Sequence, residues 1–391
     1  MLGEFFRGHR ALGPDERSFV AETVFALLRH KRSLEAVAQG DARRLILAAL
    51  VRARGFSLRE LAGAVSIADE RWLRSLKSAT APDASLAHQL ELPDWIAERL
   101  VARFGEAEAL SLGRALLESA PLDLRVNSLK SERAQVLAEL AASGIEAAPT
   151  RFAPAGVRLA GKPALQRHPL FLAGAIEVQD EASQLVCHLM APRRGEMVVD
   201  FCAGAGGKTL ALAALMRSGG RVYAFDVSER RLANLAPRLA RSGASNVHPQ
   251  RIANERDPRI SRLAAKIDRV LVDVPCSGLG TLRRNPDLKW RQQAADIDEL
   301  RAKQGAILAS AARLVKPGGR LVYATCSLLA EENEAIVGDF LKPGGFELLD
   351  AGTLLAQQGI VVVPEASDQY LRLLPHEHHT DGFFAAAMQR R

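Results

Sequence analysis

The chain has 391 residues, 48% of them hydrophobic and 25% charged, which excludes a disordered protein and indicates a globular one with two or three domains. It has no apolar run of about 18 residues and no signal-peptide pattern at its start, so we expect no membrane span and a cytoplasmic location. The net charge of +7 favours a polyanionic partner, although charge alone does not establish one.

Residues 1–85 are predicted to form an all-α domain. The acidic, proline-containing segment 14–16 is a typical helix start, and a second apolar segment covers 43–51. The apolar positions that follow the start lie on one helix face, and they are Val20, Val24, Leu27 and Leu28. Basic residues between positions 10 and 32 are predicted to be solvated and are candidates for contact with RNA.

Residues 86–164 are predicted to form a linker helix and a small α+β module. A polar linker at 78–92 precedes a helix near 93–104. The module itself follows as a strand, an amphipathic helix and a second strand, at 122–126, 133–142 and 156–159.

Residues 165–391 are predicted to form an α/β domain with a doubly wound, Rossmann-like parallel sheet, because short apolar strands alternate with helices. The four clearest strands are 198–200, 221–226, 269–273 and 320–325. The apolar run 381–388 is predicted to be a final edge strand. In such a sheet, ligands bind beyond the carboxyl ends of the strands, so the residues that follow each strand are the candidate site residues.

A glycine-rich loop follows the first of these strands. Gly204, Gly206 and Gly207 allow a tight turn and a close approach of the backbone to a ligand. Lys208 and Thr209 match the end of a nucleotide-binding P-loop, but Cys202 stands where that motif begins with glycine. The pattern therefore disfavours an ATP site.

Asp226 ends the next strand and is predicted to accept hydrogen bonds from both hydroxyls of a ribose. NAD and S-adenosylmethionine both carry such a ribose. Asp226 alone does not distinguish between them.

The four cysteines contain no C-x-x-C pair, so they are predicted to be free thiols and not a zinc site. Cys276 and Cys326 each follow a strand end, on the same rim of the sheet as the glycine loop. Cys187 has the pattern of a buried core residue instead. Two thiols that converge on one rim indicate a reactive site.

Methylation of cytosine at carbon 5 is a reaction that needs such a thiol. A thiolate that adds to carbon 6 makes carbon 5 nucleophilic, and a second thiol or another base then assists release. Asp273, in its protonated form, could hydrogen-bond to N3 of the ring, and Lys208 could favour the thiolate. The base must leave its stack to reach the pocket.

Several motifs together resemble the RsmB/NOP2/Sun family of RNA cytosine-5 methyltransferases. The matching segments are 179–184, 200–209, 273–278, 281–290, 325–327 and 381–384. Residues 12–34 resemble the NusB-like helical domain of the bacterial branch that methylates 16S ribosomal RNA. The resemblance implies a class I methyltransferase domain at 165–391, an RRM-like module before it, and a NusB-like domain whose first helix is missing or shortened.

The resemblance also implies the roles of individual residues, with S-adenosylmethionine as cofactor. Cys326 would be the nucleophile and Cys276 would assist release. Cofactor contacts would come from Cys202, Ala203, Gly204, Ala205, Gly206, Gly207, Lys208, Asp226, Asn254 and Asp273. Two of these depart from the family: Asn254 replaces an acid near the adenine, and Ala205 replaces a proline in the loop.

RNA contacts are predicted at two further places. Arg283, Arg284, Lys289 and Trp290 form a basic, aromatic loop that either faces the substrate or is solvated around a packed tryptophan. Arg125 and Asn127 of the small module are candidates for contact with the RNA backbone. The histidines at 376, 378 and 379 are predicted to form a polar loop, and no metal is expected.

Two alternative functions remain open. A DNA cytosine-5 methyltransferase would use Cys276 as nucleophile and would have no need of Cys326. A non-catalytic, RNA-binding ribosome-assembly factor would need neither thiol. Ribosomal RNA is the expected partner, 16S more than 23S, and a monomer suffices.

Overall fold

A computed structural model describes residues 2–78, 85–362 and 369–391, and the chain divides into two compact units. The helical unit comprises Met1–Glu118 and Leu282–Gln292, and the sheet unit comprises Ser119–Thr281 and Gln293–Arg391. This division differs from the predicted boundaries, because the helical unit extends beyond residue 85 and also takes in a segment from the middle of the predicted α/β domain. Among the described ranges, no helix has both the length and the apolar character needed to cross a bilayer.

Every regular element described in the helical unit is a helix, so its predicted all-α character is confirmed. The helices are α1 (Leu2–Gly8), α2 (Pro14–Arg29), α3 (Lys31–Ala38), α4 (Ala42–Ala48), the π-helical η1 (Ala49–Ala53), α5 (Ile67–Ser78), α6 (Leu86–Gln89), α7 (Asp94–Phe104), α8 (Glu106–Leu117) and α15 (Leu288–Arg291). Helix α2 begins where predicted, because the Glu16 side chain accepts the Gly13 N–H at 2.8 Å. The NusB-like resemblance of this unit stays a prediction.

The sheet unit begins with a four-stranded antiparallel sheet in the order β2-β3-β1-β4. Its strands are β1 (Leu122–Val126), β2 (Ala147–Pro149), β3 (Gly156–Leu159) and β4 (Ile176–Val178), with α9 (Arg133–Ala142) and α10 (Pro169–Leu172) between them. Helix α9 packs Val136 and Leu140 onto Leu124 and Val157 of the sheet. Because β4 completes this sheet, the module continues past its predicted end at residue 164.

The larger sheet has the order β10-β12-β9-β8-β5-β6-β7, with β11 paired to β12. Its strands are β5 (Met197–Asp200), β6 (Arg221–Asp226), β7 (Val247–Arg251), β8 (Ile267–Asp273), β9 (Val315–Thr325), β10 (Phe346–Leu349), β11 (Leu371–Leu373) and β12 (Phe383–Arg390). Strands β5 to β9 pair in parallel, which confirms the doubly wound α/β fold. The prediction of a final edge strand was wrong, since β12 lies between β9 and β10.

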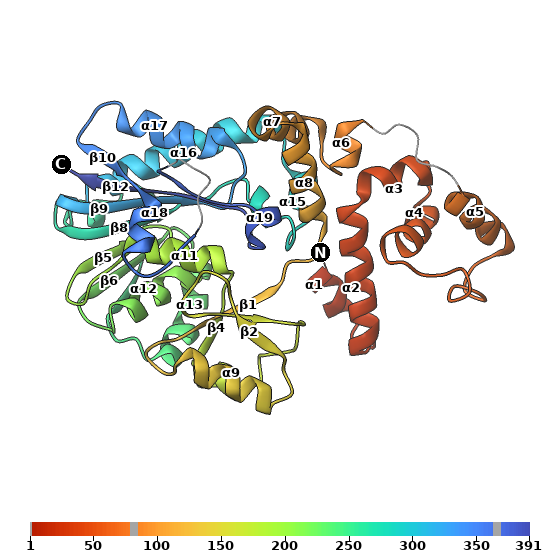
Figure 1. Cartoon of the computed structure of the whole chain (residues 1–391), viewed down its shortest axis with the longest axis horizontal. Helices are drawn as coiled ribbons and strands as arrows, with labels where there is room; N and C mark the ends of the chain where they lie inside the picture. Colours follow the sequence, from red (N-terminus) through yellow and green to blue (C-terminus); the bar gives the residue numbers. More distant parts are fainter. Residues whose placement is uncertain (1, 79–84, 363–368) are drawn as a thin grey trace. The chain divides into compact units, whose positions relative to one another are not determined.

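Helices cover both faces of the larger sheet (Figure 1). Val198 and Val199 show the alternation, since they point into the two separate cores on its opposite faces. The first core includes α11 (Glu181–Met190), α12 (Gly207–Leu215), α13 (Glu229–Ser242) and α18 (Ala351–Ala356); the second includes α14 (Pro258–Ser261), α16 (Ala294–Ala312) and α17 (Glu334–Leu341). Short helical turns complete the unit at η2 (Leu279–Thr281), η3 (Ala330–Glu332) and α19 (Pro375–His378).

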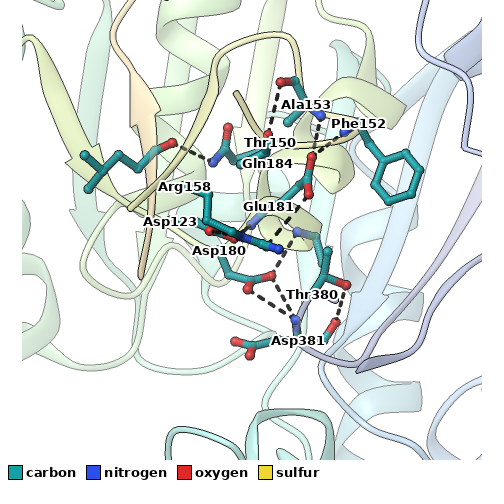
Figure 2. Close-up of polar contacts among 12 residues, drawn as sticks. Asp123, Thr150, Phe152, Ala153, Arg158, Asp180, Glu181, Gln184, Thr380 and Asp381 are labelled. Atoms are coloured by element: carbon teal, nitrogen blue, oxygen red, sulfur yellow. Dashed lines mark hydrogen bonds and ion pairs between the residues drawn. The ribbon is translucent and has the colours of Figure 1, made fainter. Parts of the chain in front are cut away.

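The start of α11 joins the two sheets through two neighbouring acids, Asp180 and Glu181 (Figure 2). The fully buried Glu181 accepts the backbone N–H groups of Phe152 at 2.5 Å and Ala153 at 2.7 Å. Asp180 caps α11 and also accepts the N–H of Asp381 from the loop before β12. In the sequence, the segment 179–184 stands out only as a family motif. In the structure it connects the small sheet to the loop before β12 through hydrogen bonds.

Candidate active site

The glycine loop runs from the end of β5 to the start of α12, and its backbone conformation explains its composition. Gly204 and Gly206 have φ angles of 56° and 83°, which side chains disfavour. A Cβ at Gly206 would overlap Leu235, whereas a Cβ at Gly204 would meet nothing within 4 Å. The loop is thus packed on one side and leaves the backbone at Gly204 open to a ligand.

Asp226 ends β6 beside this loop. Its carboxylate accepts the N–H of Gly204 at 2.8 Å and the N–H of Ser228 at 2.7 Å. Each carboxylate oxygen keeps a further lone pair for a hydroxyl. Asn254 lies exposed beyond β7, the next strand of the sheet, and its side-chain oxygen accepts the Arg256 N–H at 2.8 Å. The open glycine, the acid and the amide at this edge fit the ribose and base of an adenosine-containing cofactor.

The remaining loop residues have mainly structural contacts. The Ala203 N–H donates to Phe225 O at 2.8 Å, and Ala205 O accepts from Arg238 at 2.7 Å. Burial, reinforced by the neighbouring carboxylates of Asp200 and Asp273, raises the pKa of the Cys202 thiol well above its usual value. Cys202 is therefore a neutral thiol at the cofactor edge.

Lys208 lies in the first turn of α12, and its ammonium pairs with Asp273 at 2.6 Å. Burial by itself would lower the pKa of Lys208, but the charge and hydrogen bond of Asp273 outweigh burial and raise it above the usual value. The charge of a Cys326 thiolate would raise the pKa of Lys208 further, so the Cys326 sulfur is close enough to interact electrostatically with the ammonium. Because the ion pair requires a carboxylate, it argues against the protonated form of Asp273 that the sequence suggested.

The two strand-end cysteines meet as predicted. Cys276 follows β8 and Cys326 follows β9, and their Sγ atoms lie 3.4 Å apart. The hydrogen bond with Cys326, and then burial, raises the pKa of Cys276 well above its usual value. Cys276 therefore stays a thiol at neutral pH and can donate its S–H to the Cys326 sulfur.

Sequence reasoning missed the buried acid that holds the two cysteine loops. Glu332 has no exposed surface, and its carboxylate accepts the Ser277 N–H at 2.8 Å and the Gln304 amide at 2.9 Å. Its second oxygen accepts the Ser327 hydroxyl. Since Ser277 is next to Cys276 and Ser327 is next to Cys326, one carboxylate fixes both loops. The sequence offers only a polar run at 331–334, which is equally typical of a solvated helix start.

A close backbone approach completes the support of the cysteine loops. The Gly280 N–H donates to Cys326 O at 2.8 Å, and the Gly382 N–H donates to Gly280 O at 2.8 Å. A Cβ at Gly280 would overlap the Gly382 backbone. The segment 381–384, which resembles the family, thus contributes Gly382, and the absence of side chains at Gly280 and Gly382 allows the two backbones to lie in close contact.

Cys187 lies in α11, away from the cysteine pair, and is fully inside the core. Burial raises its pKa to about 12, so it remains a thiol. Its role as a core residue is as predicted.

The basic loop predicted to face RNA packs within the helical unit. Lys289 is 3% exposed and donates to Arg29 O at 2.9 Å, and the indole N–H of Trp290 donates to Leu28 O at 2.7 Å. Arg283 is also buried, and its carbonyl accepts from Arg29. These contacts agree with the packed-tryptophan alternative. Of the four residues, Arg284 and Trp290 keep part of their surface exposed.

Arg125 and Asn127 of the small module are both buried. The Asn127 amide donates to Gly174 O and Ser242 O, both at 2.8 Å, and thereby ties the module to α13. Both amide hydrogens are used, so the predicted contact with RNA would have to displace them. Among the histidines at 376–379, His378 accepts the Leu374 N–H at 3.0 Å.

Comparison with known proteins gives consistent matches. The family described as 16S rRNA methyltransferase RsmB/F matches residues 187–389, and the ferredoxin-like domain of RsmF/B-like methyltransferases matches residues 92–166. The probable ribosomal RNA small subunit methyltransferase B of Synechocystis sp. is 33% identical over 97% of this chain and 92% of its own length. The corresponding Bacillus subtilis protein is 33% identical over 79% of this chain and 69% of its own length. A solved methyltransferase homologue from Pyrococcus horikoshii has a TM-score of 0.68 and 31% identity, covering 80% of this chain and 100% of that chain.

Proposed function

Because the chain belongs to the RsmB/F family of S-adenosylmethionine-dependent 16S rRNA methyltransferases, we propose that it methylates carbon 5 of a cytosine through a covalent bond to Cys326. The observation that carries this proposal is the 3.4 Å separation of the Cys276 and Cys326 sulfurs at adjacent strand ends. A methyltransferase that acts on a nucleophilic nitrogen or oxygen would need neither thiol.

The surroundings of the two thiols differ, and the difference supports attack by Cys326 and assistance of release by Cys276. The hydrogen bond with Cys326 and burial raise the pKa of Cys276, which disfavours its ionisation and leaves its S–H available to the Cys326 sulfur 3.4 Å away, so we assign the attack to Cys326. The Lys208 ammonium, held by Asp273, provides a positive field for the Cys326 thiolate. A DNA-type reaction would place the attack on Cys276, the thiol whose ionisation is disfavoured here.

The proposed reaction begins with attack by Cys326 on the cytosine ring. The Cys326 thiolate forms a bond to carbon 6, and the electron pair of the C5–C6 bond makes carbon 5 nucleophilic. S-adenosylmethionine, when bound, would supply the methyl group that bonds to carbon 5, and its sulfur would keep the electron pair of the broken S–CH3 bond and become neutral. Loss of the carbon-5 proton to water restores the C5–C6 double bond and expels the Cys326 thiolate. Cys276 assists that last step by donating its S–H to the departing sulfur.

The Asp273 carboxylate has a different role from the one suggested by the sequence. In its ion pair with Lys208 it can accept a hydrogen bond from the cytosine amino group, which favours cytosine over uracil. The substrate strand is proposed to be 16S rRNA, by analogy with the small-subunit methyltransferases that the chain resembles, and the protein to be cytoplasmic and active as a monomer.

Covalent trapping tests this proposal. The protein is incubated with S-adenosylmethionine and 16S or 23S RNA fragments that contain 5-fluorocytidine, whose fluorine blocks release. We expect a denaturation-resistant adduct with 16S RNA, absent in Cys326→Ala. In Cys276→Ala we expect an adduct even with unmodified RNA, because release is slowed. The double variant, which should give no adduct, is the control for crosslinking through other thiols.

Each alternative has its own outcome. Loss of the adduct in Cys276→Ala and its retention in Cys326→Ala would indicate the DNA-type arrangement and contradict the proposal. Intact RNA binding with no adduct in the wild type would favour a non-catalytic assembly factor. An adduct with 23S RNA alone would contradict the choice of substrate but leave the chemistry standing.

A further inference from the structure

A cavity of about 790 Å³ lies in the sheet unit, apart from the cysteine pair. Its walls come from β1, the N-terminal end of α9, α11 and the C-terminal half of α12. Ala211 and Leu215 line it, about one and two helical turns beyond Gly207, whereas the cofactor loop is at the start of the same helix. None of the residues assigned above to the cofactor or to the cysteine pair lines this cavity.

Arg125 lines the cavity as a buried cation without a hydrogen-bonding partner. It is 6% exposed, its Nε atom is unsatisfied, and none of the hydrogen bonds or ion pairs found among the described residues involves its guanidinium. Glu177 lies directly across from it on β4, but Arg238 and Arg241 already bind the two Glu177 oxygens, at 2.8 and 2.6 Å. The carboxylate across from Arg125 is therefore already paired with two other arginines.

The charge of Arg125 persists despite this environment. Burial lowers the pKa of Arg125 to about 10, so the side chain is still cationic at neutral pH. A buried cation without a hydrogen-bonded counter-ion is costly to the folded state. An anionic ligand in the cavity would offset that cost.

Gln184 adds an unpaired acceptor to the same cavity. It is 1% exposed, and its amide N–H groups donate to Leu124 O at 3.2 Å and Gln179 O at 3.0 Å. Its side-chain oxygen, by contrast, is buried and has no partner within the described part of the chain. This oxygen can accept a hydrogen bond from a hydroxyl or N–H group of a ligand.

Helix α9 contributes further positive potential. The helix has ten residues, and no side chain caps its first N–H groups. Arg133, its first residue, lines the cavity together with Ser131 and the exposed Glu132. Uncapped N–H groups and a nearby arginine are a typical arrangement for binding phosphate.

We propose that this cavity binds one ribonucleotide unit, with its phosphate on Arg125 and the start of α9. A hydroxyl of the ribose, or an N–H of the base, donates to Gln184, and apolar side chains such as Leu129 and Leu215 pack against the remainder. The phosphate ester can belong to the RNA strand or to a free nucleotide. Its assignment to the RNA strand rests on the proposed function, and it gives the enzyme a grip on RNA away from the target base.

The test uses the full chain as wild type, Arg125→Met, Arg133→Ala and the exposed control Arg262→Met. Melting temperature is measured with increasing cytidine 5′-monophosphate, and affinity for a short labelled RNA is measured by fluorescence anisotropy. We expect the nucleotide to raise the wild-type melting temperature and to have no effect on Arg125→Met. RNA affinity should fall about tenfold or more in Arg125→Met and less in Arg133→Ala, with no change in the control.

A purely structural role for Arg125 predicts something else. Without ligand, Arg125→Met should melt at or above the wild-type temperature, because an unpaired buried charge has been removed. If it melts lower and nucleotide stabilises both proteins equally, the proposal is wrong. Arg133→Ala removes a partly exposed side chain and one hydrogen bond, to Ala153 O at 3.3 Å, and it decides the matter if Arg125→Met does not fold.

The nucleotide and RNA measurements together show whether the phosphate belongs to an RNA strand or to a free nucleotide. Loss of both nucleotide and RNA binding in Arg125→Met supports an RNA strand in the cavity. Loss of nucleotide binding with unchanged RNA affinity overturns the RNA assignment and supports a free nucleotide. Covalent trapping is run in parallel: its failure in the wild type would contradict the proposed reaction while leaving the binding result unaffected.

Discussion

Glu332 and Arg125 are both charged residues buried in the sheet unit, and their surroundings differ completely. Glu332 accepts hydrogen bonds from three groups that belong to the cysteine loops and to α16. Arg125 has no such bond among the described residues and lines a cavity. A buried charge with all its partners present fixes a scaffold, whereas one that lacks them indicates a place for a ligand. If this is correct, the loss of stability or activity on removing a buried charge should depend on how many hydrogen-bond partners that charge has.

The largest effect is expected from Glu332→Ala. Removing the carboxylate takes a partner from each of three buried groups, the Ser277 N–H, the Gln304 amide and the Ser327 hydroxyl. The Gln304 amide keeps Pro275 O, and the Ser327 hydroxyl keeps the Ser277 hydroxyl. We expect a loss of about 3–5 kcal/mol in the free energy of unfolding of the sheet unit. In Glu332→Gln, which retains one acceptor, kcat should fall about a hundredfold with a smaller loss of stability, because the cysteines shift relative to each other.

The aromatic residues allow the two units to be followed separately. All three tyrosines are in the sheet unit and all three tryptophans are in the helical unit. Urea unfolding followed by tyrosine absorbance should therefore report the loss in Glu332→Ala, with tryptophan fluorescence unaffected. Glu347→Gln, which removes an exposed carboxylate paired with Arg391, should change stability by less than about 0.5 kcal/mol. An equally small effect in Glu332→Ala would contradict the scaffold role.

Lys289 is an intermediate case, with one carbonyl partner for a buried ammonium. Burial lowers its pKa to about 7, although Glu91 raises it in part. The unfolded lysine binds its proton up to a pH near 10.5, so between pH 7 and 10 the unfolded state holds more protons and stability must rise with pH. Lys289→Met should abolish this rise and stabilise the helical unit at pH 7 by about 1–4 kcal/mol.

Tryptophan fluorescence during urea unfolding at pH 7 and pH 9.5 measures this effect. Lys31→Met is the matched control, since Lys31 also lies 5.1 Å from the Trp290 ring but is one-third exposed. The control should keep the wild-type dependence on pH. A wild-type protein whose stability is flat between these two pH values would contradict the assignment of Lys289 as a desolvated cation.

These contrasts also explain what the sequence could and could not predict. The position of the site at the carboxyl ends of the parallel strands was predictable. Asp200, Asp226 and Asp273 each end an apolar run, and the carboxyl ends of parallel strands lie at the same edge of a sheet. The same reasoning located Cys276 and Cys326 on one rim, at which the structure finds their sulfurs in contact. What the sequence could predict was therefore the position of groups along strands.

The partners of a buried charge were not predictable from the sequence. Lys289 lies in a basic, aromatic loop whose composition is typical of an RNA contact, and only tertiary packing shows that its ammonium is inside the helical unit. Glu332 lies in an acidic run that is typical of solvent exposure. The edge position predicted for 381–388 failed for a related reason: its apolar residues form an uninterrupted run, which is typical of a strand buried on both faces.

The smallest effect is expected at Asp200, which ends β5 and has the Thr209 hydroxyl as a partner at 2.7 Å. Burial raises its pKa to about 7, against the effect of that hydrogen bond. The stability that this group contributes is complete below about pH 4 and is lost as pH rises through 7, because the unfolded carboxyl ionises first. Asp200→Asn should remove a decline of about 1–3 kcal/mol between pH 4 and 8, measured by tyrosine absorbance, while the exposed Asp298→Asn should retain it. If Asp200→Asn keeps the wild-type decline, the hydrogen bonds from Thr209 and the Cys202 backbone are enough to hold the buried Asp200 ionised, whereas Arg125 has no such bond among the described residues.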